Sequence, residues 1–145
     1  MLKLISKFTL LITILVILYL LISGNLFSAS PFVIAGQVIA VALSVWSRRS
    51  FQQGQFNIHA EPVAGRPLLR TGPYRFIRHP MYASALLLVW SGILGHWSIL
   101  NAVIGLINTG AIAVRIIVEE RLLQSIYPDY SEYSRKTRRI VPFII

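Results

Sequence analysis

The chain has 145 residues and a formal net charge of +9, and 55% of its residues are hydrophobic while only 13% are charged. A soluble domain carries about 25% charged residues, so this composition argues against a soluble protein and favours a membrane protein. The length predicts a single domain, residues 1–145. Cysteine is absent, which excludes disulfide bonds, thiolate metal ligands and a cysteine nucleophile.

The charged residues are confined to segments outside two long runs, residues 8–47 and 81–114, in which no Asp, Glu, Lys or Arg occurs. A nucleic-acid-binding protein would carry its basic surface on a soluble fold, so we expect no nucleic acid partner. Basic clusters that flank apolar runs instead mark the cytoplasmic side of a membrane. We therefore expect a multi-pass integral membrane protein with both termini in the cytoplasm.

The first charge-free run is long enough for two membrane spans, because one span needs about 20 residues. Small polar residues and a proline between Ser23 and Pro31 predict that one helix ends there and another begins. We place the two spans at about 8–27 and 30–47.

A cleaved signal peptide is the alternative interpretation of the N-terminus. Lys3 and Lys7 would form its positive region, and Ser28–Ser30 would supply small residues for cleavage. The apolar stretch is long for that role, and Pro31 would directly follow the cut. A retained span is therefore favoured.

The second charge-free run would be about 51 Å long as one helix, which is too long for a single span. It predicts a tight helical hairpin with arms at about 80–96 and 98–116 and a turn at Gly95–Ser98. The predicted fold is an all-α integral membrane protein with about four transmembrane helices. The cytoplasmic loop, residues 48–79, and the cytoplasmic tail, residues 117–145, are expected to close the site at one end of the bundle.

Charged and hydrogen-bonding residues gather where the hairpin meets the cytoplasmic segments. Arg115 and Glu119 are four residues apart and therefore share one helix face. Because the hairpin arms are antiparallel, the start of the third span should lie beside this pair. The groups expected to converge are those of Arg78, His79, Tyr82, Arg115, Glu119 and Glu120. A snorkelling arginine with a surface ion pair is the plainer interpretation of Arg115 and Glu119, but it leaves the other four unexplained.

The three histidines, His59, His79 and His96, are too far apart in the sequence to show metal-ligand spacing, so no metal site is expected. His96 falls in the outer turn of the hairpin. His59 falls in the loop, where it either lines the site or is solvated. The basic tail segment, Arg135–Arg139, is expected to contact lipid headgroups.

Several elements in this order resemble the isoprenylcysteine carboxyl methyltransferase family, within a wider group that includes the membrane phospholipid N-methyltransferases. The elements are Trp46–Arg49, Pro67–Tyr74, Arg78–Tyr82, Arg115 with Glu119–Glu120, and Tyr130, Tyr133 and Pro142. The resemblance extends from about Gly36 to the C-terminus. The RHPxY string alone is a moderate signal, whereas the ordered set is specific.

The resemblance implies a helical membrane fold whose loop and tail close over S-adenosylmethionine. It also implies that Arg115 and Glu119 act in catalysis, with Arg115 facing the acceptor. The cofactor contacts that it implies are His59, Arg66, Pro67, Leu68, Leu69, Tyr74, Arg78, His79, Tyr82, Glu119 and Glu120.

The expected reaction is methylation of a lipophilic acceptor, most simply the carboxylate of a prenylcysteine-like or other lipid-linked molecule. Arg115 would hold a carboxylate bidentately but would repel an ammonium group. The alternatives are a phospholipid or amine N-methyltransferase, an NADPH-dependent sterol reductase-like enzyme, and a non-catalytic protein that retains the fold. Such reductases typically read RHPNY where this chain has Met81. The expected partners are the lipophilic substrate and membrane lipids, and no obligate protein partner is evident.

Overall fold

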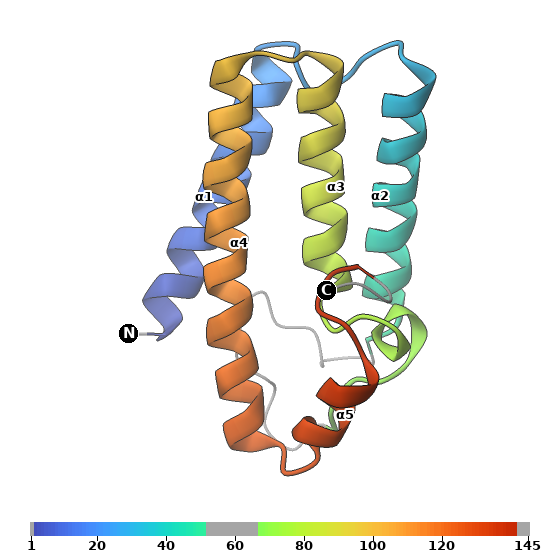
Figure 1. The fold of residues 1–145 in the computed structure, drawn as a ribbon, viewed down its shortest axis with the longest axis vertical. Coiled ribbons are helices and arrows are strands. Elements are labelled where there is room, and N and C mark those ends of the chain that lie inside the picture. The colour runs from blue at the N-terminus through green and yellow to red at the C-terminus, as the bar shows by residue number, and fades with distance from the viewer. Residues whose placement is uncertain (1, 52–66, 142–145) are drawn as a thin grey trace.

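The computed structural model describes residues 2–51 and 67–141, with side chains from Lys7 onward. This part of the chain is helical, with five α-helices, one 3₁₀ helix and no strand. The helices are α1 (Leu2–Ile22), α2 (Pro31–Arg49), η1 (Gly72–Arg75, the 3₁₀ helix), α3 (Pro80–Gly95), α4 (Ile99–Ile126) and α5 (Tyr130–Lys136). The first four α-helices run along the long axis of the molecule, and α5 and η1 lie at one end of it (Figure 1). The all-α prediction is confirmed.

Proline, glycine and serine set the helix boundaries. Pro31 and Pro80 stand in the first positions of α2 and α3, where a missing backbone N–H costs nothing. Gly24 follows α1 with a φ of 73°, a left-handed conformation that glycine adopts without strain. The Ser98 hydroxyl caps α4 by accepting a hydrogen bond from the backbone N–H of Asn101 at 3.1 Å. The predicted breaks before α2 and between α3 and α4 are therefore confirmed.

Two helices have bounds that differ from the ranges expected for the spans. The first helix begins at Leu2 and already ends at Ile22, because the turn around Gly24 stops it short of residue 27. The helix of the second hairpin arm continues past residue 116 to Ile126. No helix-breaking residue occurs in this extension until Pro128, so the helix continues beyond the apolar stretch.

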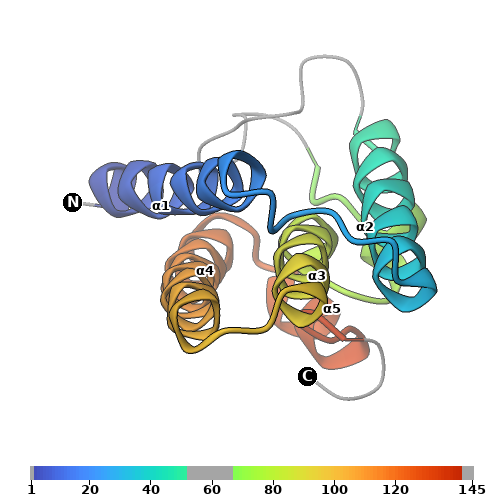
Figure 2. The same ribbon diagram turned by 90° about the horizontal axis from the view of Figure 1, so that it is seen from above.

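Helix α3 is central in the bundle. It packs between α2 and α4, while α1 packs mainly against α4 and meets α3 near one end (Figure 2). The apolar core lies where α1, the connector after it and α3 meet, and consists of Val16, Leu20, Leu26, Val89 and Ile93. The core therefore holds together the end of the bundle opposite α5.

The contact between α2 and α3 depends on small side chains. The buried residues of α2, Val33, Ala40 and Ser47, recur every seven positions, so one narrow face meets α3. A Cβ atom added at Gly36 would come within 2.4 Å of the Ser91 hydroxyl. Small residues at such positions let two helices approach closely, as they do in membrane bundles.

Two of the described helices, α2 and α4, are long and apolar enough to cross a membrane by length and composition. The remaining two helices of the bundle are shorter apolar helices: Lys7–Ile22 within α1, and α3, Pro80–Gly95. Large apolar side chains face outward along the bundle, as Phe32 does with 88% of its surface exposed. Water solvates such a surface poorly, whereas lipid tails solvate it well.

A polar cluster fixes the end of the bundle that is farthest from α5. Asn101 donates from Nδ2 to the His96 carbonyl at 2.7 Å and accepts from the Tyr19 hydroxyl at 3.2 Å. The His96 ring Nε2 lies 2.7 Å from the carbonyl oxygen of Phe27. These bonds tie α1 and its connector to the hairpin turn, and they place His96 away from the cluster described below.

Candidate active site

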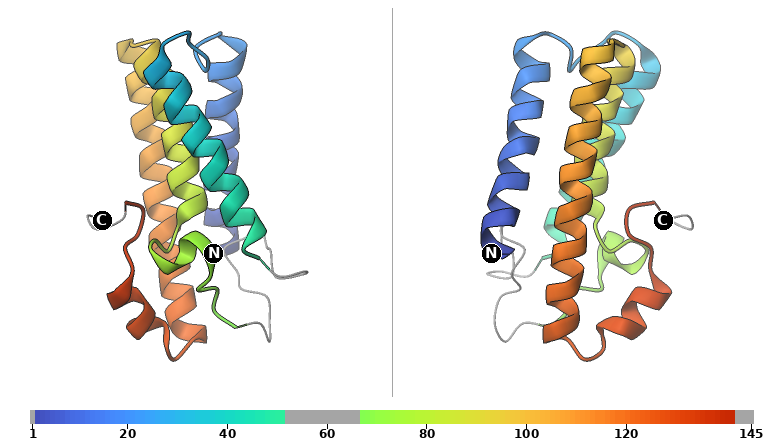
Figure 3. Two further views of the ribbon diagram at one scale, coloured as in Figure 1. Left: turned by 90° about the vertical axis from the view of Figure 1, so that its right-hand side faces the viewer. Right: turned by 60° about the vertical axis from the view of Figure 1, so that its left-hand side comes forward.

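The tail folds back and pairs with the segment that leads into α3. Backbone N–H groups of Arg78 and His79 donate to the carbonyls of Arg138 and Arg139 at 2.7 and 3.0 Å, and the N–H of Arg138 donates to the Phe76 carbonyl at 3.0 Å. The pairing is an isolated parallel bridge centred on Ile77 and Arg138. It brings the segment that follows α5 against the start of α3, beside the lower part of the bundle (Figure 3).

Glu120 is the charged centre of this arrangement. Its two carboxylate oxygens accept from Arg78 Nε at 2.8 Å and from Arg139 Nε at 3.0 Å, and His79 Nε2 lies 3.4 Å away. Burial disfavours the charged carboxylate, but the nearby His79 imidazole, together with the hydrogen bond and the charge of Arg78, outweighs this and lowers the pKa of Glu120 to about 2. Glu120 lies on the extension of α4 beyond its long apolar stretch. Glu120 is therefore ionised at neutral pH, and its negative charge offsets the positive charges of Arg78 and Arg139.

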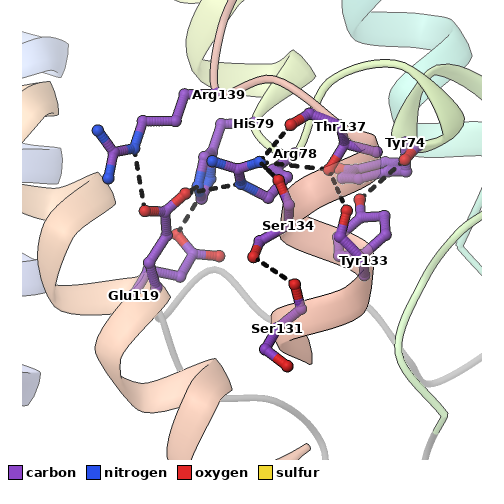
Figure 4. A network of polar contacts seen from close by, with 10 residues as sticks. Tyr74, Arg78, His79, Glu119, Ser131, Tyr133, Ser134, Thr137 and Arg139 are labelled. Carbon is purple, nitrogen blue, oxygen red and sulfur yellow. Dashed lines mark hydrogen bonds and ion pairs between the residues drawn. The ribbon is translucent and has the colours of Figure 1, made fainter. Parts of the chain in front are cut away.

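Arg78 connects Glu120 to the tail. Its Nη1 donates to the Ser134 carbonyl at 2.8 Å, to the Thr137 carbonyl at 2.5 Å and to the Thr137 hydroxyl at 3.3 Å (Figure 4). One guanidinium group thus joins α3, α4 and the end of α5. Its planar set of donors suits this role, which a lysine could not fill.

A second set of groups surrounds Tyr82, one turn into α3. The Tyr82 hydroxyl donates to Glu119 Oε2 at 2.6 Å, and the Arg115 guanidinium carbon lies 5.3 Å from the centre of the Tyr82 ring. The His79 ring stacks on the Tyr82 ring, with the ring centres 5.5 Å apart. The Nδ1 atom of His79 is 4.0 Å from Glu119 Oε2. Tyr82 therefore contacts both the cation and the anion presented by successive turns of α4.

Burial separates the two charged residues on α4. The Arg115 residue is 6% exposed, whereas the Glu119 side chain is 24% exposed. The Glu119 carboxylate is therefore more accessible to a ligand than Arg115, which is buried in the bundle.

The segment before α3 is bonded to the region of α5. The Tyr133 hydroxyl of α5 donates to the Tyr74 carbonyl at 2.8 Å, and Arg70 forms an ion pair with Asp129. Burial, together with the negative charge of Glu119, raises the pKa of Tyr74, and burial raises that of Tyr133. Both phenols therefore stay protonated at neutral pH.

Gly72 allows the same segment to lie against the end of α2. Its φ is 58°, and a Cβ atom there would come within 2.0 Å of the Ser50 hydroxyl and 3.2 Å of the Trp46 ring nitrogen. This close approach positions η1, which contains Tyr74, next to the site.

The structure brings together all six residues that were expected to converge. Pro67, Leu68 and Leu69 lie in an irregular segment before η1. His59 and Arg66 lie outside the described residues. Arg78 and Glu120 are predicted to bind the cofactor. In the structure their side chains form an ion pair with each other, and Glu120 also pairs with Arg139.

Three residues of the tail make contacts that the sequence did not predict: Ser134, Thr137 and Arg139. Arg139 was expected to contact lipid headgroups, which stays a prediction, and the structure shows that it pairs with Glu120. The excess of basic residues in the tail over nearby acids was the signal that one of them has a carboxylate partner elsewhere. Within residues 2–51 and 67–141, no three His, Asp or Glu side chains lie close enough together to hold a metal ion.

Comparison with known proteins gives one relative and one family. The cobalt-zinc-cadmium resistance protein CzcN of Cupriavidus metallidurans is 35% identical over 88 residues, which cover 55% of this chain and 39% of that protein. The chain thus spans about two fifths of the length of that relative. No solved structure is significantly similar to this chain. A family model described as phospholipid methyltransferase matches residues 25–130, well over half of the chain and the region that contains Tyr82, Arg115 and Glu119. The chain therefore belongs to the phospholipid methyltransferase family, within the group of membrane methyltransferases that its motifs resemble.

Proposed function

We propose that this membrane methyltransferase uses S-adenosylmethionine to methylate the polar head of a lipophilic acceptor, where the helical bundle meets the aqueous phase. The observation that carries this proposal is the position of Arg115 and Glu119 around Tyr82. The two residues offer opposite charges side by side at the end of an apolar helix. A zwitterionic cofactor and a charged head group together need such a pair.

The described residues fit this cofactor chemically. Bound S-adenosylmethionine supplies an electrophilic methyl group on a sulfonium sulfur. Glu119 is exposed enough to accept hydrogen bonds from an ammonium group or ribose hydroxyls, and Tyr82 fixes its orientation through a 2.6 Å bond. The stacked rings of His79 and Tyr82 form a flat wall beside it. Further contacts from Tyr74, Pro67–Leu69, His59 and Arg66 remain part of this proposal.

Arg115 supports a carboxylate as the accepting group. A carboxylate is already ionised at neutral pH, so the chain has to supply no general base. A guanidinium group binds both carboxylate oxygens in one plane and so fixes the direction of attack. Because Arg115 is buried at the end of the apolar stretch, it would receive the head group of a molecule whose tail stays in the bilayer.

An amine head group is the second candidate, and the family match favours it. An ammonium group must lose a proton before it can accept a methyl group. Glu120 is a poor base for this, because His79 and Arg78 hold its pKa at about 2 despite its burial. The base would then be His79 or Glu119, and the charge of Glu119 would offset the repulsion from Arg115.

We further propose that the bundle crosses the membrane four times, with both termini in the cytoplasm. The start of α1, the end of α2, the start of α3 and the end of α4 lie at the same end of the bundle (Figure 1). The basic segments of the sequence therefore gather on the side that holds the site, as expected for a cytoplasmic face.

Calorimetric titration of the detergent-purified protein with S-adenosylmethionine, its demethylated product and NADPH tests the proposed function. We expect saturable binding of the first two, weakened in Glu119→Ala. Arg115→Ala should abolish turnover while largely sparing cofactor binding. Binding of NADPH alone would favour the reductase-like alternative, and binding of none of the three would favour a non-catalytic protein. Equal loss of turnover and cofactor affinity in Arg115→Ala would overturn the acceptor role.

A further inference from the structure

Helix α4 carries three polar residues at intervals of seven: Asn101, Asn108 and Arg115. All three are buried, with 2%, 0% and 6% of their surface exposed. Seven residues make nearly two helical turns, so neighbours in this series point the same way and are about 10.5 Å apart along the axis. Asn101 holds the far end of the bundle and Arg115 stands in the candidate site. Asn108, between them, has neither role.

The side chain of Asn108 is unpaired in the described part of the chain. Neither its amide nitrogen nor its amide oxygen has a hydrogen-bond partner, although the residue is fully buried. Asn101, by contrast, both donates to His96 and accepts from Tyr19. Burying an unpaired amide costs free energy that a leucine in the same place would not cost. Packing alone therefore does not account for an asparagine here.

We propose that Asn108 is a specificity-determining residue that hydrogen-bonds the acyl ester carbonyls of a glycerophospholipid acceptor. This inference rests on the proposed function, because it requires the head group to lie at Arg115 and Glu119. The Asn108 amide then lies about two helical turns deeper, on the same face of α4.

The spacing of the polar groups in the two candidate acceptors favours the phospholipid. In an ethanolamine phospholipid, the phosphate and the glycerol separate the reacting amine from the ester carbonyls by a length similar to two turns of helix. The amide N–H groups of Asn108 are donors suited to these carbonyls. A prenylcysteine has only hydrocarbon at the corresponding distance from its carboxylate. It would leave Asn108 unpaired.

In this proposal the lipid acceptor reaches Asn108 laterally from the bilayer, between α1 and α3. The bond between Tyr19 and Asn101 fixes the antiparallel register of α1 and α4, which places Ile12 level with Asn108. The core contacts between α1 and α3 come from Val16 and Leu20, in the second half of α1. The first half of α1 diverges from α3 (Figures 1 and 2). An acyl chain that separated these two helices would meet α4 at the level of Asn108.

The test uses the full chain in mixed micelles, with methyl transfer from S-adenosylmethionine to three acceptors. These are diacyl phosphatidylethanolamine, its dialkyl ether analogue with chains of equal length, and N-acetyl-S-farnesylcysteine. The ether analogue lacks only the ester carbonyls. We expect the wild type to have a kcat/KM about tenfold higher for the diacyl lipid than for the ether lipid, the effect of one lost hydrogen bond. Asn108→Leu should remove this preference by losing activity on the diacyl lipid alone.

Thr109→Val is the matched control. Thr109 lies one residue further along α4, where its hydroxyl accepts from Trp90 Nε1 at 3.0 Å, and the variant should keep the preference. The melting temperature of Asn108→Leu should equal or exceed that of the wild type, whereas a fall would assign Asn108 to structural hydrogen bonding. Equal use of the two lipids by the wild type, or methylation of the farnesylcysteine alone, would overturn the inference but leave the methyltransferase intact. Absence of cofactor binding in calorimetry would overturn both.

Discussion

Arg78, just before α3, and Glu120, on the extension of α4, form an ion pair of 2.8 Å in which both side chains are at most 10% exposed. Arg78 also holds the carbonyls of Ser134 and Thr137. The pair therefore links the two arms of the hairpin to the tail. Its neighbour Glu119 contacts Tyr82 instead, so adjacent carboxylates serve different purposes.

Replacing Glu120 by alanine should release the tail. Removing one partner of a buried ion pair leaves an uncompensated charge and costs about 3–5 kcal/mol. We expect a lower melting temperature in detergent and faster tryptic cleavage after Arg135 and Lys136. Glu119→Ala is the control, since it should weaken cofactor binding while the tail stays protected. Identical cleavage rates in the two variants would show that Glu120 does not hold the tail.

Tyr82→Phe should weaken cofactor binding without unfolding the protein. The change removes the hydroxyl that orients Glu119 but keeps the ring beneath Arg115. A hydrogen bond to a charged group contributes about 1.5–3 kcal/mol, so the dissociation constant for S-adenosylmethionine should rise at least about tenfold. Calorimetry measures this change, and far-ultraviolet circular dichroism verifies the fold. An unchanged affinity would mean that Tyr82 does not position Glu119 for the cofactor.

The sequence was sufficient to predict which side chains meet at the hairpin. A four-residue spacing puts Arg115 and Glu119 on one helix face, and the antiparallel turn brings Tyr82 back beside them. Both features depend on local periodicity, which a single sequence displays directly.

The contacts that hold the tail could not be predicted in this way. Arg139 reaches Glu120 because the segment around Arg138 pairs with Ile77, and both partners are irregular segments far apart in the chain. No hydrophobic period marks such a pairing. The unpaired amide of Asn108 escaped notice for a related reason, since an asparagine within an apolar run shows its burial only once the neighbouring helices are in place.

Gly92→Ala should destabilise the bundle. A Cβ atom there would lie 2.9 Å from the Leu26 carbonyl oxygen and 3.0 Å from that of Asn25, and backbone atoms cannot move aside easily. Overpacking of this kind costs about 1–3 kcal/mol. Gly110→Ala, on α4, is the matched control, because nothing lies within 4 Å of the added atom. It should be neutral or stabilising by up to about 1 kcal/mol. Thermal denaturation of both variants in one detergent compares them, and equal melting temperatures would contradict the tight contact.

The stabilisation provided by Glu120 should depend on pH in a defined direction. Its pKa is lowered from 4.5 to about 2 in the folded protein, so the folded state favours the ionised carboxylate. The corresponding stability is fully present above the ordinary pKa and is lost as the pH falls toward about 2. The difference in melting temperature between the wild type and Glu120→Gln should therefore be constant from about pH 8 to pH 5.5 and should shrink below about pH 4.5. A difference that instead grew on acidification would mean that the folded protein favours the protonated acid, and that the ion pair with Arg78 does not stabilise the site.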